Sequence, residues 1–94
     1  MIGVYATGKV KADKQTEFVA LMQQFLSESR SHQGCISYDC GADIKRPLHY
    51  CFIERWASQA DLDAHLNSPF FQTNAPKLVA LLEDGLDINV LDLV

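Results

Sequence analysis

Residues 48–56, LHYCFIERW, restrict the possible folds of this chain more than any other segment. Aromatic and β-branched side chains dominate the segment, which predicts a β-strand. Side chains alternate between the two faces of a strand, so Glu54 and Trp56 lie on one face and Cys51 and Ile53 on the other. Neither face is polar throughout, as the wet face of an antiparallel sheet would be. The sheet that contains this strand therefore needs cover on both faces.

Three further segments have the pattern of strands. Alternating apolar residues and composition predict strands at residues 2–10, 35–43 and 86–94, in addition to 48–56, with a turn at 45–47. Four short strands separated by turns or helices are a normal content for one small sheet. We therefore expect a single four-stranded sheet.

Helical spacing of apolar residues predicts one long helix and two shorter helical segments. The long helix covers about residues 14–32, with Asp13 as its N-cap. Its apolar stripe consists of Phe18, Leu21, Met22, Phe25 and Leu26. Ser58 and Ser68 are placed to begin the shorter segments, and Pro76 is expected to kink or restart the second one.

The order of these elements is β-α-β-β-α-β, which predicts an α+β, ferredoxin-like fold with a four-stranded antiparallel sheet. We expect one domain over residues 1–94. Helices on this topology cover one face of the sheet only. Because strand 48–56 carries apolar side chains on both faces, we expect a second copy of the chain to cover the other face. The sequence therefore predicts a homodimer.

Charge and composition exclude several classes of partner. The net charge is −4, and the eight basic residues are scattered, so neither nucleic acid nor a membrane surface is an expected partner. The sequence contains no apolar run long enough for a membrane span and no secretory signal pattern at residues 1–14. Cys35, Cys40 and Cys51 lack C-x-x-C spacing and are interpreted as free thiols of open role. We expect a cytoplasmic protein.

Four sequence pieces carry a resemblance to a known family. They are GCISYD at 34–39, FIERW at 52–56, LDAHL at 62–66 and SPFF at 68–71. In this order and spacing they resemble the antibiotic biosynthesis monooxygenase domains, which include cofactor-free quinol and polyketide monooxygenases. The resemblance implies a dimeric α+β barrel of two protomers packed sheet to sheet, each with its own pocket between sheet and helices.

His65 is the first candidate for a role in chemistry. Leu62 and Leu66 accompany it at helical spacing, which places its imidazole on the inward side. A buried imidazole stays neutral near pH 7 and can take a proton from an acidic phenol or quinol. The structural alternative is a core histidine bonded to a backbone carbonyl.

Glu54 and Trp56 share the strand face that we assign to the helices. A buried carboxylate must be paired, protonated or solvated, so Glu54 could orient His65, bind a substrate hydroxyl, or serve as a structural link. Trp56 could stack on an aromatic substrate or belong to the core. Possible pocket-lining residues are Tyr5, Tyr38, Phe52, Phe70, Phe71 and Asn74.

Metal and cofactor sites receive no support from residue spacing. His32, His49 and His65 are far apart in sequence, and no G-x-G-x-x-G follows a strand. The haem-degrading branch of the family carries an Asn and a ligand His where this chain has Tyr5 and Ala75. The resemblance thus implies an enzyme without cofactor, with a small electron-rich aromatic substrate and O₂ as partners. Two alternatives stay open: a ligand-binding or stress-related barrel, and an isomerase or hydrolytic enzyme for a small carbonyl compound.

Overall fold

The computed structural model describes residues 1–94 and has the element order βαββααβ. The elements are β1 (Ile2–Lys9), α1 (Gln15–Arg30), β2 (Cys35–Ala42), β3 (His49–Trp56), α2 (Gln59–Leu66), α3 (Pro69–Ala80) and β4 (Asp87–Asp92). The four strands form one antiparallel sheet in the order β2-β3-β1-β4. This confirms the predicted α+β, ferredoxin-like fold. None of the three helices has the length and apolar character that a membrane crossing requires.

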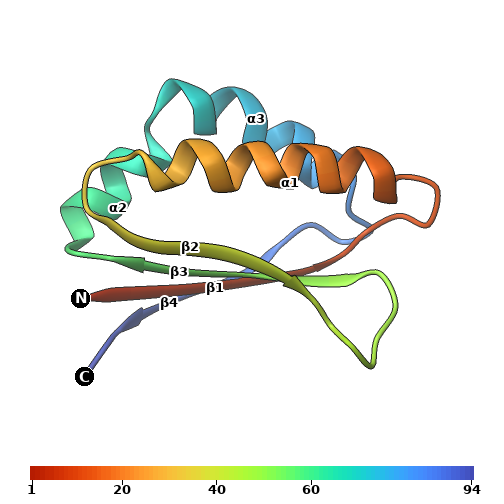
Figure 1. The fold of residues 1–94 in the computed structure, drawn as a ribbon, viewed down its shortest axis with the longest axis horizontal. Coiled ribbons are helices and arrows are strands. Elements are labelled where there is room, and N and C mark those ends of the chain that lie inside the picture. Colours follow the sequence, from red (N-terminus) through yellow and green to blue (C-terminus); the bar gives the residue numbers. More distant parts are fainter.

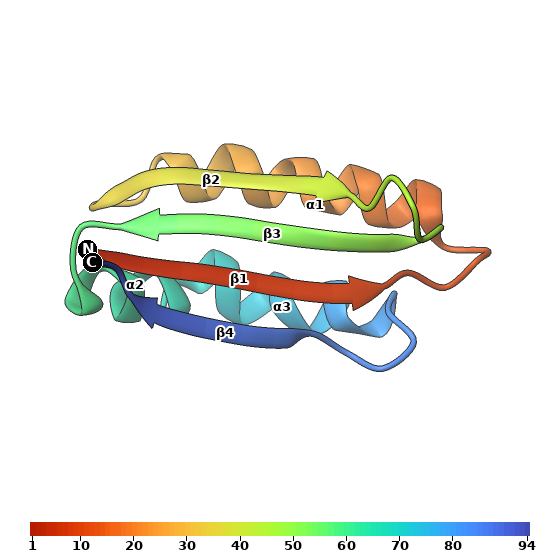
Figure 2. The ribbon, with the colours of Figure 1, turned by 90° about the horizontal axis from the view of Figure 1, so that it is seen from below.

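All three helices lie on the same side of the sheet. Figure 1 shows α1 and α3 side by side above the strands, with α2 at the end of the sheet where the chain begins. Seen from below, the strands face the viewer with no helix in front of them (Figure 2). The fold therefore consists of one helical layer and one sheet layer, and the second face of the sheet is bare within a protomer.

The strand register decides which side chains meet the helices. Val4 of β1 pairs with Glu54 of β3 and with Val90 of β4, whereas Tyr5 pairs with Ile53 and Asn89. Val4 and Glu54 are buried, and Tyr5 and Ile53 are exposed. Because the side-chain period of a strand is two residues, even-numbered residues of β1 and β3 face the helices and odd-numbered residues face away.

Helix capping confirms two of the three predicted starts. The Ser58 hydroxyl accepts a hydrogen bond from the Asp61 backbone at the start of α2. The Ser68 hydroxyl does the same for Phe71 at the start of α3. Each cap satisfies a backbone N–H that has no partner within its helix.

Two details of the helices differ from the sequence predictions. Asp13 is not the N-cap of α1, since the turn that begins at Lys11 extends one residue further and makes Lys14 the cap, without a side-chain hydrogen bond. Pro76 does not restart α3, which continues to Ala80, so of the two predicted effects only the kink stays a prediction. Pro76 is exposed, so water can hydrate the one backbone carbonyl that its missing N–H leaves without a helical partner.

Candidate active site

An apolar cavity lies between the sheet and the helical layer. Its empty space, including the part that opens to solvent, is about 540 Å³. Thirteen of its fifteen lining residues are hydrophobic, and the two exceptions are Glu54 from β3 and His65 from α2. A concave apolar site with two convergent polar groups is the usual form of a small-molecule site.

The fold holds His65 in the wall of this cavity. The Ser58 cap fixes the start of α2, Leu62 packs into the core one turn earlier, and the His65 side chain is only 2% exposed. Aromatic rings surround the imidazole, with centroid distances of 4.5 Å to Trp56 and 5.1 Å to Phe71. Burial, and to a lesser degree the neighbouring His32, lower the pKa of His65 from 6.5 to about 4. His65 is therefore a neutral imidazole near pH 7.

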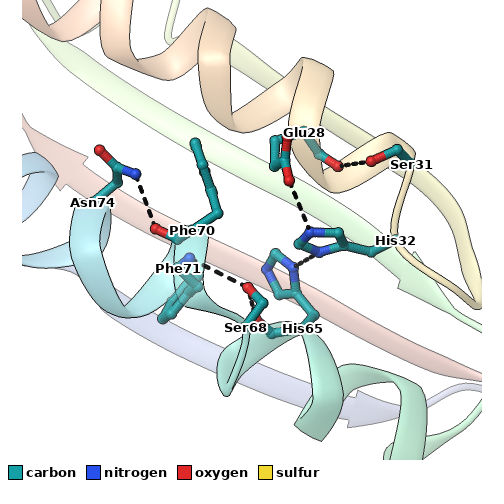
Figure 3. A network of polar contacts seen from close by, with 8 residues as sticks. All are labelled: Glu28, Ser31, His32, His65, Ser68, Phe70, Phe71 and Asn74. Carbon is teal, nitrogen blue, oxygen red and sulfur yellow. Dashed lines mark hydrogen bonds and ion pairs between the residues drawn. The ribbon is translucent and has the colours of Figure 1, made fainter.

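His32 is the polar partner of His65, and sequence reasoning missed it. The Nδ1 atoms of the two histidines lie 2.8 Å apart, a hydrogen-bonding distance. On its other side, His32 Nε2 lies 3.6 Å from Glu28 Oε1. Figure 3 shows the His32 ring between Glu28 and His65, with both contacts drawn. The one available signal was the i,i+4 spacing of Glu28 and His32 at the end of the long helix.

Glu54 is a buried carboxyl group with one hydrogen-bond partner. Its side chain is 7% exposed, and Oε1 accepts a hydrogen bond from Trp56 Nε1 at 3.0 Å. Burial raises the pKa of Glu54 from 4.5 to about 7, and the hydrogen bond from Trp56 opposes this shift. Near neutral pH, Glu54 can thus either donate or accept a proton in the cavity. No hydrogen bond joins Glu54 to His65, so His32 takes the orienting role that Glu54 was considered for.

Trp56 lies behind the cavity wall. It is fully buried and does not line the cavity, and its N–H is bound to Glu54. A substrate in the cavity would therefore not stack on its indole, as the sequence interpretation proposed. The indole instead packs against His65 and holds one oxygen of Glu54 in place.

The remaining predicted lining residues divide into two groups. Tyr38, Phe52 and Phe71 line the cavity. Tyr5, Phe70 and Asn74 do not. Tyr5 belongs to the odd-numbered side of β1 and lies on the bare face of the sheet, whereas Phe70 packs edge-on against the Phe25 ring. The Asn74 amide donates a hydrogen bond to the Phe70 carbonyl within α3.

Metal ligands are not grouped in this structure, since no three His, Cys, Asp or Glu side chains lie together as a metal site requires.

The cavity can perform acid–base chemistry. It combines a neutral imidazole with a carboxyl group whose pKa is about 7, in apolar surroundings. Such a pair is suited to a substrate that loses or gains a proton.

Comparison with known proteins identifies the family. The sequence model of antibiotic biosynthesis monooxygenases matches residues 1–76. The chain belongs to the antibiotic biosynthesis monooxygenase family. A crystal structure described as an antibiotic biosynthesis monooxygenase superposes with a TM-score of 0.92 at 28% identity, over 100% of this chain and 99% of the other.

The chain is also similar to two curated proteins. "Uncharacterized protein sll1783" of Synechocystis is 40% identical over 82 residues, which are 87% of this chain. The chain spans 56% of the length of that relative. "Putative monooxygenase YcnE" of Bacillus subtilis is 30% identical over 88 residues, which are 94% of this chain and 93% of that protein.

Proposed function

We propose that this member of the family is a cofactor-independent monooxygenase that oxidises a small electron-rich aromatic compound with O₂. Quinols, phenols and anthrones are the substrate types that the cavity suits. One observation carries the proposal: an apolar cavity in a monooxygenase-family fold has only two lining residues that are not hydrophobic, Glu54 and His65, and both are ionisable. Burial raises the pKa of Glu54 and lowers the pKa of His65, and both changes favour the uncharged form.

Proton removal is the step that this cavity would accelerate. Dioxygen has a triplet ground state and reacts slowly with closed-shell molecules, but an aromatic anion can pass an electron to it. His65 would take the proton of the substrate, and the apolar walls would exclude water around the resulting anion. Recombination of the substrate radical with reduced oxygen forms a C–O bond, and reprotonation gives a hydroperoxide. Loss of water from the hydroperoxide then leaves a quinone-type carbonyl.

Glu54 would hold the substrate in this scheme. One carboxyl oxygen is occupied by Trp56 Nε1, which leaves the other oxygen free for a ligand. With a pKa of about 7, Glu54 can donate to a carbonyl or accept from a hydroxyl across the physiological range. Tyr38, Phe52 and Phe71 would provide the aromatic walls around the ring.

A second function is consistent with the same pair of side chains. A neutral imidazole and a protonatable carboxyl group on one cavity could move a proton between two atoms of a small carbonyl compound. This would be an isomerase reaction that consumes no O₂. Anaerobic exchange of substrate hydrogen for solvent deuterium, in the absence of oxygen uptake, distinguishes it from the oxygenase.

We also propose that the protein works as a homodimer in the cytoplasm. The bare sheet face carries the exposed side chains of Tyr5, Ile53 and Leu91, which a second copy would cover. The exposure of such groups to water is unfavourable at roughly 25 cal/mol per Å² of apolar area. The thiols of Cys35, Cys40 and Cys51 are free, which suits a reducing compartment.

The proposed function is tested by oxygen uptake with a panel of hydroquinones and anthrones. Metal-free wild-type protein is expected to consume O₂ faster than the spontaneous reaction. His65→Ala is expected to lower this rate by roughly 10²-fold or more, the usual size of a general-base contribution. His49→Ala is the matched control, because His49 lies outside the cavity and binds the Pro47 carbonyl. Uptake at the spontaneous rate across the whole panel would contradict the oxygenase proposal.

A further inference from the structure

His65 separates the apolar cavity from a second, polar depression at the surface. The depression is lined by His32, Gln33, Asp61, Ala64, His65 and Ser68. His65 is thus the one side chain that both hollows share. A group in this position can receive a proton on one side and release it on the other.

We infer that His32 and Glu28 form a proton relay that carries the substrate proton from His65 to solvent. This inference rests on the proposed function, because a relay is needed only if His65 removes a proton. The relay consists of the 2.8 Å contact between the two Nδ1 atoms and the 3.6 Å contact between His32 Nε2 and Glu28 Oε1. Figure 3 shows the three side chains in a row that leads from α2 to the end of α1.

The contact between two Nδ1 atoms fixes how the rings share protons. A hydrogen bond requires one donor and one acceptor, so only one of the two Nδ1 atoms carries the proton at a time. When His65 donates through Nδ1, its Nε2 is unprotonated and is the basic nitrogen. His32, as the acceptor, then carries its proton on Nε2, the nitrogen that faces Glu28. This arrangement is the resting state of the relay.

Proton transfer through the relay leaves His65 uncharged at the end of the step. His65 Nε2 accepts the substrate proton, and the Nδ1 proton of His65 passes to Nδ1 of His32. The His32 imidazolium is stabilised by the Glu28 carboxylate, and its Nε2 proton leaves for solvent. The substrate anion stays in the cavity beside neutral His65, and each histidine has changed tautomer. Return of one proton along the same path protonates the peroxide anion and restores the resting state.

The alternative route through Glu54 ends inside the protein. The hydrogen-bond partner of Glu54 is Trp56, which is fully buried and gives no access to solvent. Glu28, in contrast, has a side chain that is 47% exposed. A proton taken by His65 thus has a continuous path to water through His32.

Charged and titratable groups around the two histidines come from α1, α2, β2 and β3, whereas α3 contributes the apolar ring of Phe71. Glu28 faces His32 from α1, and Asp61 of α2 lines the same depression. Tyr38 of β2 lies 5.6 Å from His65 between ring centroids, and Glu54 of β3 lines the cavity with it. Burial raises the pKa of Tyr38, so its hydroxyl stays neutral. The two acidic side chains therefore lie on the outer side of the histidine pair, toward the depression, and Glu54 and Tyr38 lie on the cavity side.

The test uses ionisation of a bound phenol in the absence of oxygen. Anaerobic wild-type protein is mixed with 4-nitrocatechol in a stopped-flow pH jump, and the visible absorbance of the bound anion is followed. His32→Ala is expected to slow ionisation at least tenfold without changing the affinity for 4-nitrocatechol, because His32 does not line the cavity. Added imidazole is expected to restore the rate by entering the depression. Glu28→Gln is expected to slow the reaction a few-fold, and the His49→Ala control to leave it unchanged.

The outcomes separate the relay from the oxygenase reaction. Slow ionisation in His32→Ala that imidazole restores supports the relay, since a purely structural defect would not respond to a small buffer. Equal ionisation rates in wild type and His32→Ala overturn it, as does a wild-type protein that binds 4-nitrocatechol without ionising it. Normal relay kinetics combined with no protein-dependent oxygen uptake on the quinol panel would overturn the oxygenase function and leave the relay standing.

Discussion

Glu54 and His65 are both held uncharged because an ion in the cavity wall loses its hydration. Between pH 4.5 and about 7, folded Glu54 keeps a proton that the unfolded chain releases. Between pH 6.5 and about 4, folded His65 lacks a proton that the unfolded chain binds. The free energy of unfolding therefore falls with rising pH through Glu54, and falls with decreasing pH through His65. Between 4.5 and 6.5 the two effects oppose each other.

Replacing Glu54 should separate these two effects. Glu54→Gln keeps an oxygen that accepts the Trp56 N–H but removes the titration. The free energy of unfolding of the variant minus that of wild type should increase as pH rises from 4.5 to about 7. Below and above this interval, the difference should not depend on pH. The gain should approach roughly 3 kcal/mol, at about 1.4 kcal/mol for each pH unit. Urea denaturation across this range measures it, and a pH-independent difference would exclude a protonated Glu54.

The Trp56 N–H is predicted to keep the Glu54 pKa from rising further. Trp56→Phe preserves an aromatic ring beside His65 but removes the hydrogen-bond donor. Because that hydrogen bond lowers the pKa of Glu54, the variant should show a Glu54 pKa above 7 and lose about 1 kcal/mol or more of stability. Carbon-detected NMR titration of the carboxyl group measures the first effect. An unchanged Glu54 pKa would show that the indole packs without influencing the acid.

The sequence contained enough information to predict that Glu54 and His65 are buried, but not which residues they contact. Strand parity places Glu54 on the same face as Trp56, and helix spacing places His65 beside Leu62. Tyr5 was misassigned because one step in register moves a side chain to the other face of a sheet. His32 follows α1 and reaches His65 across 33 positions of sequence, so only the folded geometry brings the two together.

At the level of elements, the connection from α1 to β2 depends on Gly34. Its φ of +78° is in the left-handed region, and a Cβ added there would overlap the Asp61 side chain of α2. The Gly34 carbonyl also accepts a hydrogen bond from Ala57 just before α2. This glycine therefore sets the approach of α2 to the end of α1, and with it the contact between His32 and His65.

Substitution at Gly34 should therefore disturb stability and site together. Gly34→Ala is expected to cost at least 1–2 kcal/mol, the usual penalty of a left-handed conformation with a Cβ, and more from the overlap with Asp61. Gly41→Ala is the matched control, since a Cβ there meets no atom within 4 Å. Urea denaturation should show a large loss for the first variant and almost none for the second. Equal stability of the two would contradict the close packing of α2 on this turn.

Local sequence signals predicted most element boundaries because the responsible interactions are local. Ser58 and Ser68 each cap a helix through a backbone N–H three residues later, which the sequence spacing shows directly. Asp13 is also a good capping residue type but does not cap α1. The Lys14 N–H donates a hydrogen bond to the Lys11 carbonyl, so residues 11–14 form a turn and the helix begins after it. Which turn forms there depends on how β1 continues past Val10 to pair with Leu82, a contact distant in sequence.

At the level of the whole molecule, the bare sheet face is the feature that a single protomer leaves unexplained. Tyr5 and Ile53 are directly paired across β1 and β3, and their side chains are 42% and 55% exposed. Leu91 lies on the same face of β4 and is also exposed. Figure 2 shows this face without any covering helix. Val4, Ala6 and Phe52 on the even-numbered face are buried against the helices. A copy packed on the odd-numbered face would bury the apolar side chains of that face in the same way.

A charge placed on this face should therefore prevent association. Ile53→Asp is expected to convert a dimer into a monomer in sedimentation at micromolar concentration, because an unpaired carboxylate at the centre of the interface would be buried. Ile44→Asp is the matched control: Ile44 is 97% exposed in the connection between β2 and β3, so its replacement should leave the dimer intact. A wild-type protein that sediments as a stable monomer would remove the need for a second copy. It would leave the cavity and the His32–His65 contact unaffected, since both are built from one chain.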